Sequence, residues 1–107
     1  MPSLLGIKIN ELRRARGLTL DQLAQATDSS KSYMWEIENK EVARPSAEKL
    51  DKIAEALGVT AAFLIDASQD RPTEAVEDTA FYRKYQKADP DVKAKLKRIL
   101  DVLDDDD

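Results

Sequence analysis

Apolar residues recur three and four positions apart along this chain, and that spacing is the period of an α-helix. Leu5, Ile9 and Leu12 follow it near the start, and Ile53 and Leu57 follow it further on. Val, Ile and Thr never alternate with polar residues over the length of a β-strand. The pattern therefore predicts an all-α protein.

Capping residues and helix breakers divide this pattern into seven predicted helices. The sequence Thr19-Leu20-Asp21-Gln22 forms a capping box, and Asp89-Pro90 places an N-cap before a proline at the first helical position. Gly17 and Gly58 stand where helices are expected to end. The helices are expected at about residues 4–16, 19–26, 30–39, 47–57, 60–65, 74–88 and 90–103.

Residues 66–73, DASQDRPT, are polar, contain a proline and lack periodicity, so they are predicted to form a linker. The chain then divides into a helical domain at residues 1–65 and a second helical segment at residues 74–107. The formal net charge is −4, but residues 1–65 hold nine Lys/Arg and nine Asp/Glu, so the excess acidity lies in residues 66–107. A neutral domain can bind DNA when its basic residues share one face, although its attraction to random sequence is weak.

The composition excludes several classes of function. The chain has no Cys and no His, and it therefore has no disulfide, thiol nucleophile, imidazole base or imidazole metal ligand. It also has no glycine loop that cradles phosphates, so we expect no enzyme, no cofactor and no metal. No apolar run approaches the ~20 residues that span a bilayer, and the N-terminus lacks an apolar signal core. We expect a cytoplasmic protein without a membrane partner.

The predicted helices at residues 19–26 and 30–39 are joined by the three-residue turn Thr27-Asp28-Ser29, which is the arrangement of a helix-turn-helix. The core that they share with the first helix is expected to contain Leu23, Met34 and Ile37. Arg13 and Glu38 are expected to form a structural ion pair between the first and third helices.

Residues 7–65 resemble the helix-turn-helix family of phage repressors and Cro proteins, also called the XRE family. The matching stretches are INELRRARGLTLDQLAQ, SSKSYMWEIENK and PSAEKLDKIAEALGVTAAFL. The resemblance implies a five-helix lambda-repressor-like DNA-binding domain whose third helix lies in the major groove. The chain departs from the family at Asp28 and Lys40, where glycine is usual, at Ser29, usually hydrophobic, and at Leu20, a base-contacting Gln in several relatives. Asp tolerates a left-handed backbone, so Asp28 is compatible with the turn.

The outer side of the third helix is expected to read DNA. The residues expected to contact bases are Ser30, Lys31, Ser32, Trp35 and Glu36. Lys31 can donate to guanine O6 and N7, and Glu36 can accept from cytosine N4. Trp35 is expected either to contact a thymine methyl or the sugar–phosphate wall, or to cover the core edge or the C-terminal helices. The residues expected to contact phosphates are Thr19, Gln22, Tyr33, Asn39, Lys40 and Arg44.

The last predicted helix carries a short heptad seam of apolar residues. It is expected to fold back on the first domain, to form a helical hairpin with the preceding helix, or to pair with its twin as a dimerisation segment. A dimer places two recognition helices about 34 Å apart, so self-association is favoured. The expected dimer contacts are Phe81, Tyr85, Val92, Leu96, Ile99 and Leu103. The terminal DDDD is expected to be a solvated acidic tail.

The segment AFYRKYQKADPDVKAKLKRILDVLDDDD also resembles the tails of small repressors encoded beside a zinc metallopeptidase and of regulators in some toxin–antitoxin operons. The expected function is a sequence-specific transcriptional regulator of double-stranded DNA, a repressor that binds an inverted-repeat operator as a homodimer. The alternative is an antitoxin or partner-binding module whose protein partner is a toxin or a regulatory peptidase.

Overall fold

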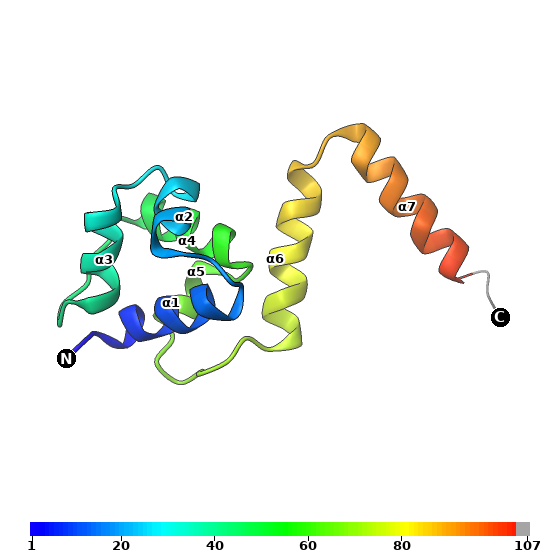
Figure 1. The fold of residues 1–107 in the computed structure, drawn as a ribbon. Helices are drawn as coiled ribbons and strands as arrows, with labels where there is room; N and C mark the ends of the chain where they lie inside the picture. Colours follow the sequence, from blue (N-terminus) through cyan, green and yellow to red (C-terminus); the bar gives the residue numbers. More distant parts are fainter. Residues whose placement is uncertain (105–107) are drawn as a thin grey trace.

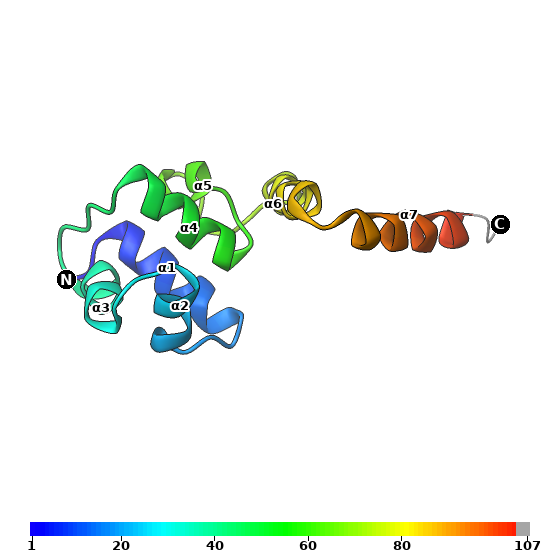
Figure 2. The same cartoon turned by 90° about the horizontal axis from the view of Figure 1, so that it is seen from above.

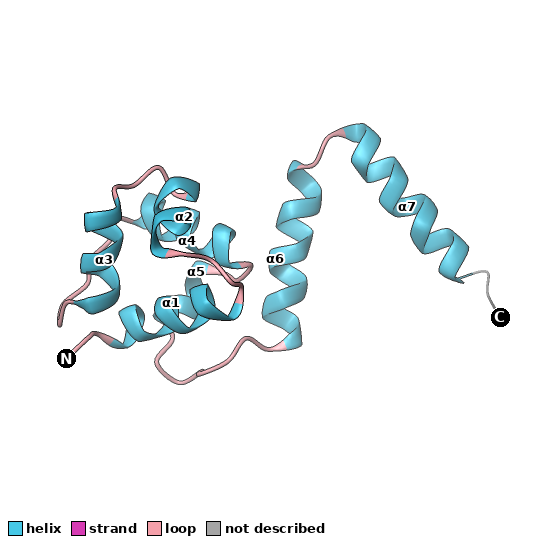
Figure 3. Cartoon of the chain, viewed as in Figure 1, coloured by secondary structure: helices cyan, strands magenta, loops and turns pink. Residues whose placement is uncertain are grey.

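The computed structural model describes residues 1–104, and these form seven α-helices and no β-strand (Figures 1 and 3). The helices are α1 (Leu4–Ala15), α2 (Leu20–Ala26), α3 (Lys31–Asn39), α4 (Ala47–Leu57), α5 (Ala61–Ile65), α6 (Glu74–Lys87) and α7 (Pro90–Asp104). The prediction of an all-α protein is confirmed, and every described boundary lies within one residue of its expected place. The rest of the predicted acidic tail, residues 105–107, lies outside the described residues.

Short hydroxyl side chains begin the first six helices. Each accepts a hydrogen bond from the backbone N–H three residues later, and the six are Ser3, Thr19, Ser30, Ser46, Thr60 and Thr73. In the predicted capping box, the Gln22 side-chain oxygen also accepts from the Thr19 backbone N–H at 2.8 Å. Such caps satisfy N–H groups that the first helical turn leaves without an intrahelical partner. The starts of these helices are therefore set locally.

Helices α1 to α5 enclose one apolar core. Its buried members are Ile9, Leu23, Ala24, Met34, Ile37, Ile53, Ala54, Leu57, Val59, Phe63 and Leu64. The expectation that Leu23, Met34 and Ile37 share this core with the first helix is confirmed. Burial of each larger side chain stabilises the fold by about 1.5–3 kcal/mol before the loss of chain entropy is counted.

The turn between α2 and α3 is held from inside and from α4. Asp28 adopts a left-handed backbone with φ 55°, as its side-chain type allows. The buried Thr27 hydroxyl donates to the Leu23 carbonyl at 2.9 Å. From α4, the Lys49 ammonium donates to the Thr27 carbonyl at 2.6 Å, and Lys52 lies 3.3 Å from the Asp28 carboxylate. These contacts fix the angle at which α3 leaves α2.

Helix α6 packs beside the first domain, next to α4 and α5 (Figure 1). Ala80 is buried in this contact, and the Arg83 guanidinium donates from Nη2 to the Val59 carbonyl at 2.9 Å. Near the end of α6, the Lys87 ammonium lies 3.0 Å from the Glu55 carboxylate. The predicted linker at residues 66–73 runs between α5 and α6 without a helix of its own.

Helix α7 leaves this body and extends away from it (Figures 1 and 2). None of its described residues is buried. It neither packs on the first domain nor lies along α6 as a closed hairpin, because the two helices diverge from the short connection at residues 88–89. Pairing of α7 with a second copy, or with another protein, stays a prediction.

The part of the chain that the structure describes contains neither a membrane-spanning helix nor a cluster of side chains that could hold a metal ion. No helix within residues 1–104 is both long enough and apolar enough to cross a membrane. The same residues contain no group of three or more carboxylates placed to hold a metal ion.

Candidate nucleic-acid interface

Helix α3 lies on the side of the first domain that faces away from α6 and α7 (Figures 1 and 2). Its inner residues Met34 and Ile37 are buried, so the opposite side of the helix faces solvent. That outer side carries Lys31, Ser32 and Trp35, all exposed. The helix therefore presents a continuous free face, with the C-terminal arm well away from it.

A close approach to α1 positions α3. Gly6 of α1 is buried, and a Cβ atom built there would lie 2.6 Å from the backbone carbonyl oxygens of both Ile37 and Glu38. No real Cβ atom tolerates such a distance, so the two helices approach this closely only because residue 6 lacks a side chain. A glycine inside a helix is unfavourable by about 1 kcal/mol relative to alanine. The presence of Gly6 within a predicted helix was therefore the one sequence signal of this close approach.

A buried polar cluster ties the end of α3 to α1. The Arg13 Nε atom lies 2.7 Å from Glu38 Oε2, and Arg13 Nη2 lies 3.1 Å from Glu38 Oε1. Arg13 also donates to the Leu18 carbonyl at 2.9 Å, and Asn10 donates to Glu38 Oε1 at 2.7 Å. Glu38 is only 2 % exposed, so its carboxylate has almost no contact with water. Hydrogen bonds from Arg13 and Asn10 of α1 take the place of water around it. The structure thus places the expected pair in contact and adds Asn10 to it.

The residues expected to read bases occupy different situations. The Ser30 hydroxyl accepts from the Tyr33 backbone N–H at 3.0 Å and is used as the helix cap. Glu36 pairs with Lys40 one turn later at 3.4 Å, and both are exposed. Trp35 is 52 % exposed, and its helix α3 lies on the opposite side of the first domain from α6 and α7, so it does not cover the C-terminal helices. Lys31, Ser32 and Trp35 are the members whose side chains stay free on the outer face.

The residues expected to contact phosphates flank this face. Thr19 and Gln22 form the capping box at the N-terminus of α2, in which the side chain of each accepts from the backbone N–H of the other. These two bonds hold the first turn of α2 in place. Tyr33 is half-buried, and Asn39 donates to the Trp35 carbonyl at 2.9 Å. Arg44 is exposed in the segment between α3 and α4. Whether these groups meet phosphates stays a prediction, because the contacts within the chain do not test it.

Four of the nine cations in residues 1–65 serve the internal structure of the domain. The Lys and Arg side chains that donate to buried or half-buried carbonyls or carboxylates are Lys8, Arg13, Arg16 and Lys49. Within residues 1–104, no hydrogen bond or ion pair engages the side chains of Lys31 and Arg44. Among the described residues, only these two cations beside α3 are therefore free to meet DNA, Lys31 at the start of the helix and Arg44 after its end.

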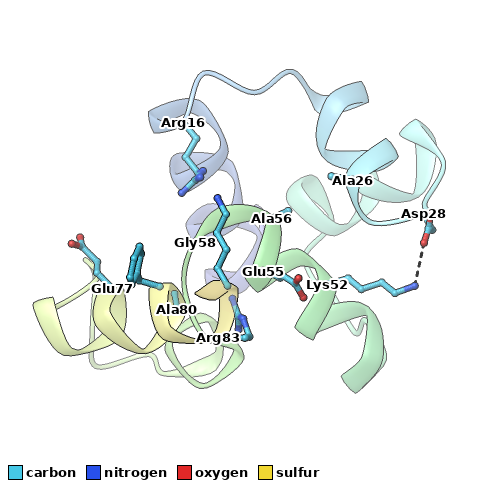
Figure 4. Close-up of a pocket in the computed structure, with 12 residues that line it drawn as sticks. Arg16, Ala26, Asp28, Lys52, Glu55, Ala56, Gly58, Glu77, Ala80 and Arg83 are labelled. Carbon is cyan, nitrogen blue, oxygen red and sulfur yellow. Dashed lines mark hydrogen bonds and ion pairs between the residues drawn. The ribbon is translucent and has the colours of Figure 1, made fainter. Parts of the chain in front are cut away.

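A separate cleft lies at the seam between α4 and α6 (Figure 4). It has a volume of about 730 Å³, and its lining includes Arg16, Lys52, Glu55, Glu77 and Arg83. The Lys87 hydrogen bond lowers the pKa of Glu55 from its usual 4.5. Because both signs of charge line the cleft, it lacks the single-sign field that captures phosphate or carboxylate ligands.

Comparison with known proteins places the first five helices in a defined family. A sequence profile described as a helix-turn-helix domain matches residues 4–64, which is more than half of the chain. The HTH-type transcriptional regulator SinR of Bacillus subtilis (strain 168) is 30% identical over 67 residues. The match covers 63% of this chain and 60% of SinR, so the chain corresponds to less than two thirds of that relative's length.

Solved structures extend the likeness to the arrangement of helices. A crystal structure of SinR, the master regulator for biofilm formation, in complex with DNA has 32% identity and a TM-score of 0.55, covering 58% of this chain and 98% of that one. The clp gene regulator ClgR from Corynebacterium glutamicum has 26% identity and a TM-score of 0.51, covering 91% and 86%. A SinR–SinI complex has 23% identity and a TM-score of 0.58 over 94% of each chain, which concerns the fold alone.

Proposed function

Since the chain belongs to the XRE-type helix-turn-helix family of transcriptional regulators, we propose that it binds double-stranded DNA sequence-specifically and regulates transcription. We propose further that it acts as a repressor, and that it binds an inverted-repeat operator as a homodimer in the cytoplasm. The proposal assigns no reaction to the chain, in agreement with a family of DNA-binding regulators.

The observation that carries this proposal is the two-sided construction of α3. Its inner side is locked to α1 by the approach at Gly6 and by the Arg13–Glu38 pair. Its outer side leaves Lys31 and Trp35 free and faces away from the rest of the chain. A rigid helix with an uncommitted polar and aromatic face is what entry into a major groove requires.

Within this proposal, Lys31, Ser32 and Trp35 are the residues most available to contact base edges. Glu36 reads cytosine only after its pair with Lys40 opens, and that pair is exposed and therefore weak. Lys40 is then free to approach a phosphate, and Arg44 is free without any such opening. The N-terminus of α2, organised by the Thr19–Gln22 box, offers backbone N–H groups to a phosphate.

Selection of bound sites from a random DNA pool at about 150 mM salt tests this function. Enrichment of an inverted repeat, with half-sites about one helical turn apart, would establish a dimeric sequence reader. A pool without any enriched sequence would overturn the proposal.

The Lys31→Ala variant tests one expected base contact. It should bind the enriched site about 1–3 kcal/mol more weakly than the parent and lose preference at one base pair. Arg14→Ala, an exposed change on α1, serves as the control.

The exposed apolar side of α7 favours a second candidate function, that of an antitoxin or partner-binding module. Ile99 and Leu103 are 55% and 63% exposed, and a soluble chain rarely leaves such a row uncovered. Deletion of residues 74–107 distinguishes the two functions. Loss of operator binding would support the dimeric regulator, whereas retained operator binding with loss of a biological partner would support the module.

A further inference from the structure

A shallow hollow lies between the start of α2 and the outer face of α3. It has a volume of about 300 Å³, and it is lined by Leu20, Lys31, Ser32, Trp35 and Glu36. Leu20 is the first residue of α2 and is half-buried against the core, which holds its side chain in place. Trp35 stands across from it on α3. The hollow therefore has one fixed aliphatic wall and one aromatic wall.

Packing within the chain accounts for the Leu20 wall but not for the exposed Trp35 wall. Trp35 keeps 52 % of its surface exposed, although its neighbours Met34 and Ile37 are buried. The α6–α7 arm lies on the other side of the domain and cannot cover it (Figures 1 and 2). The hollow is therefore open to another molecule on the face of α3 that is proposed to meet DNA.

We propose that Leu20 and Trp35 form a notch that accepts the 5-methyl group of a thymine in the major groove, and that this contact determines part of the sequence specificity. The inference rests on the proposed function, because it needs α3 to lie in DNA. It adds Leu20, a residue of α2, to the set that reads bases.

The chemistry of the major groove supports this occupant. Among the groups that base pairs present there, the thymine methyl is the apolar one, while the others donate or accept hydrogen bonds. Lys31 and Glu36 border the hollow, so polar groups are available to the base edges next to the methyl. Because residues 1–65 are electrically neutral, non-specific attraction is weak and contacts to bases must supply more of the affinity.

Replacing thymine by uracil removes the methyl and leaves the hydrogen-bonding edge unchanged. The site enriched from the random pool is synthesised with deoxyuridine at each thymine position in turn, and binding of the full-length chain is measured. At one position in each half-site, we expect about a fourfold loss of affinity, the value of one buried methyl. Substitution in both half-sites should give about a 16-fold loss.

Variants identify the residues that sense the methyl. Trp35→Ala, at an exposed position, should reduce the ratio of thymine to uracil affinity to nearly one. Leu20→Asn keeps the size of the wall but makes it polar, and it should reduce the same ratio. Ile65→Ala removes a similarly exposed side chain, 65% exposed on α5, and should keep the fourfold ratio.

The outcomes separate this inference from the function beneath it. An enriched site whose affinity ignores every uracil would overturn the notch and leave the regulator intact. A uracil effect that persists in both Trp35→Ala and Leu20→Asn would also overturn it. A random pool without enrichment would overturn both proposals, because a methyl reader must enrich thymine at a fixed position.

Discussion

Glu38 is a charged side chain with almost no contact with water, and it illustrates how single residues position α3. It is 2 % exposed and lies at the end of the helix proposed to enter DNA. Its carboxylate is bonded by Arg13 and Asn10, both from α1. Removing one member of such a pair leaves a buried charge without compensation, which costs more than the pair itself contributes.

Arg13→Ala should therefore lower the free energy of unfolding by about 3 kcal/mol. Urea denaturation measures this change. Arg14→Ala is the matched control, because Arg14 is the next residue along the chain and is exposed. Its free energy of unfolding should stay within about 0.5 kcal/mol of the parent. A loss below about 1 kcal/mol in Arg13→Ala would show that the pair does not compensate Glu38.

Gly6 is the second residue whose effect is decided by a close contact. In an unobstructed helix, Gly6→Ala would stabilise the chain by about 1 kcal/mol. Here the added Cβ would meet two backbone oxygens at 2.6 Å, so overpacking is expected to win, with a net loss of about 1–2 kcal/mol. Thermal or urea unfolding gives the sign directly.

The glycine at position 17 offers the comparison for this prediction. It has φ +70° and no atom within 4 Å of a built Cβ, so its replacements suffer backbone strain but no clash. Gly6→Leu should lose more stability than Gly6→Ala, whereas Gly17→Leu and Gly17→Ala should be about equal. An equal pair at position 6 would argue against the tight approach of α1 and α3.

At the scale of elements, α6 is held to the first domain by few contacts. Val76 and Ala80 supply the apolar part, and Arg83 and Lys87 supply two polar links. The Arg83 Nε atom is buried without a hydrogen-bond partner within residues 1–104, and an unmade bond of this kind costs about 1–3 kcal/mol. The attachment of α6 is therefore expected to be weak compared with the core beneath it.

The link between Lys87 and Glu55 makes this attachment depend on pH. The hydrogen bond from Lys87 lowers the pKa of Glu55 in the folded chain below its usual 4.5. A lowered folded-state pKa stabilises above the unfolded value, and the contribution disappears as pH falls through the folded value. The docking of α6 should be constant from neutral pH to about 5 and weaken below 4.5, by less than about 1 kcal/mol because both groups are exposed.

Hydrogen-exchange protection of the α6 backbone amides, corrected for the intrinsic pH dependence of exchange, measures this effect. Lys87→Ala should show lower protection at neutral pH and no further loss on acidification. Protection that falls equally in the parent and in Lys87→Ala would assign the pH effect to other carboxylates.

At the scale of the whole molecule, the proposed DNA face and the exposed arm lie at opposite ends. The chain measures 52 × 28 × 24 Å along its principal axes, with α3 at one end and α7 at the other (Figure 1). Helix α7 exposes several large apolar side chains and buries none of its described residues. This separation allows a second copy to pair along α7 while both recognition helices remain free.

Leu96→Asp should therefore convert a dimer into monomers, because it places a carboxylate in the middle of the heptad seam. Sedimentation measures the mass, and operator affinity should fall with it. Ala94→Asp introduces the same carboxylate off the seam and should leave the dimer intact. If Leu96→Asp sediments like the parent, α7 is not the interface.

The sequence by itself determined the features that depend on neighbours along the chain. Ser and Thr caps act over three residues, so the helix starts were predicted within one position. The left-handed backbone at Asp28 agrees with the expectation that Asp is compatible with the turn. Periodicity, caps and breakers gave the order of the helices, and the Arg13–Glu38 contact was expected from the positions of the two residues on the first and third helices. The resemblance of residues 7–65 to a family then added the five-helix arrangement.

Only the tertiary structure decided what depends on the angles between helices. Lys49 reaches the Thr27 carbonyl across 22 positions, and Leu20 faces Trp35 because α2 and α3 cross at one particular angle. The sequence also could not show that α6 packs on the first domain while α7 does not, since both helices carry apolar residues at helical spacing. Such contacts depend on summed packing over many distant residues, and no local pattern encodes that sum.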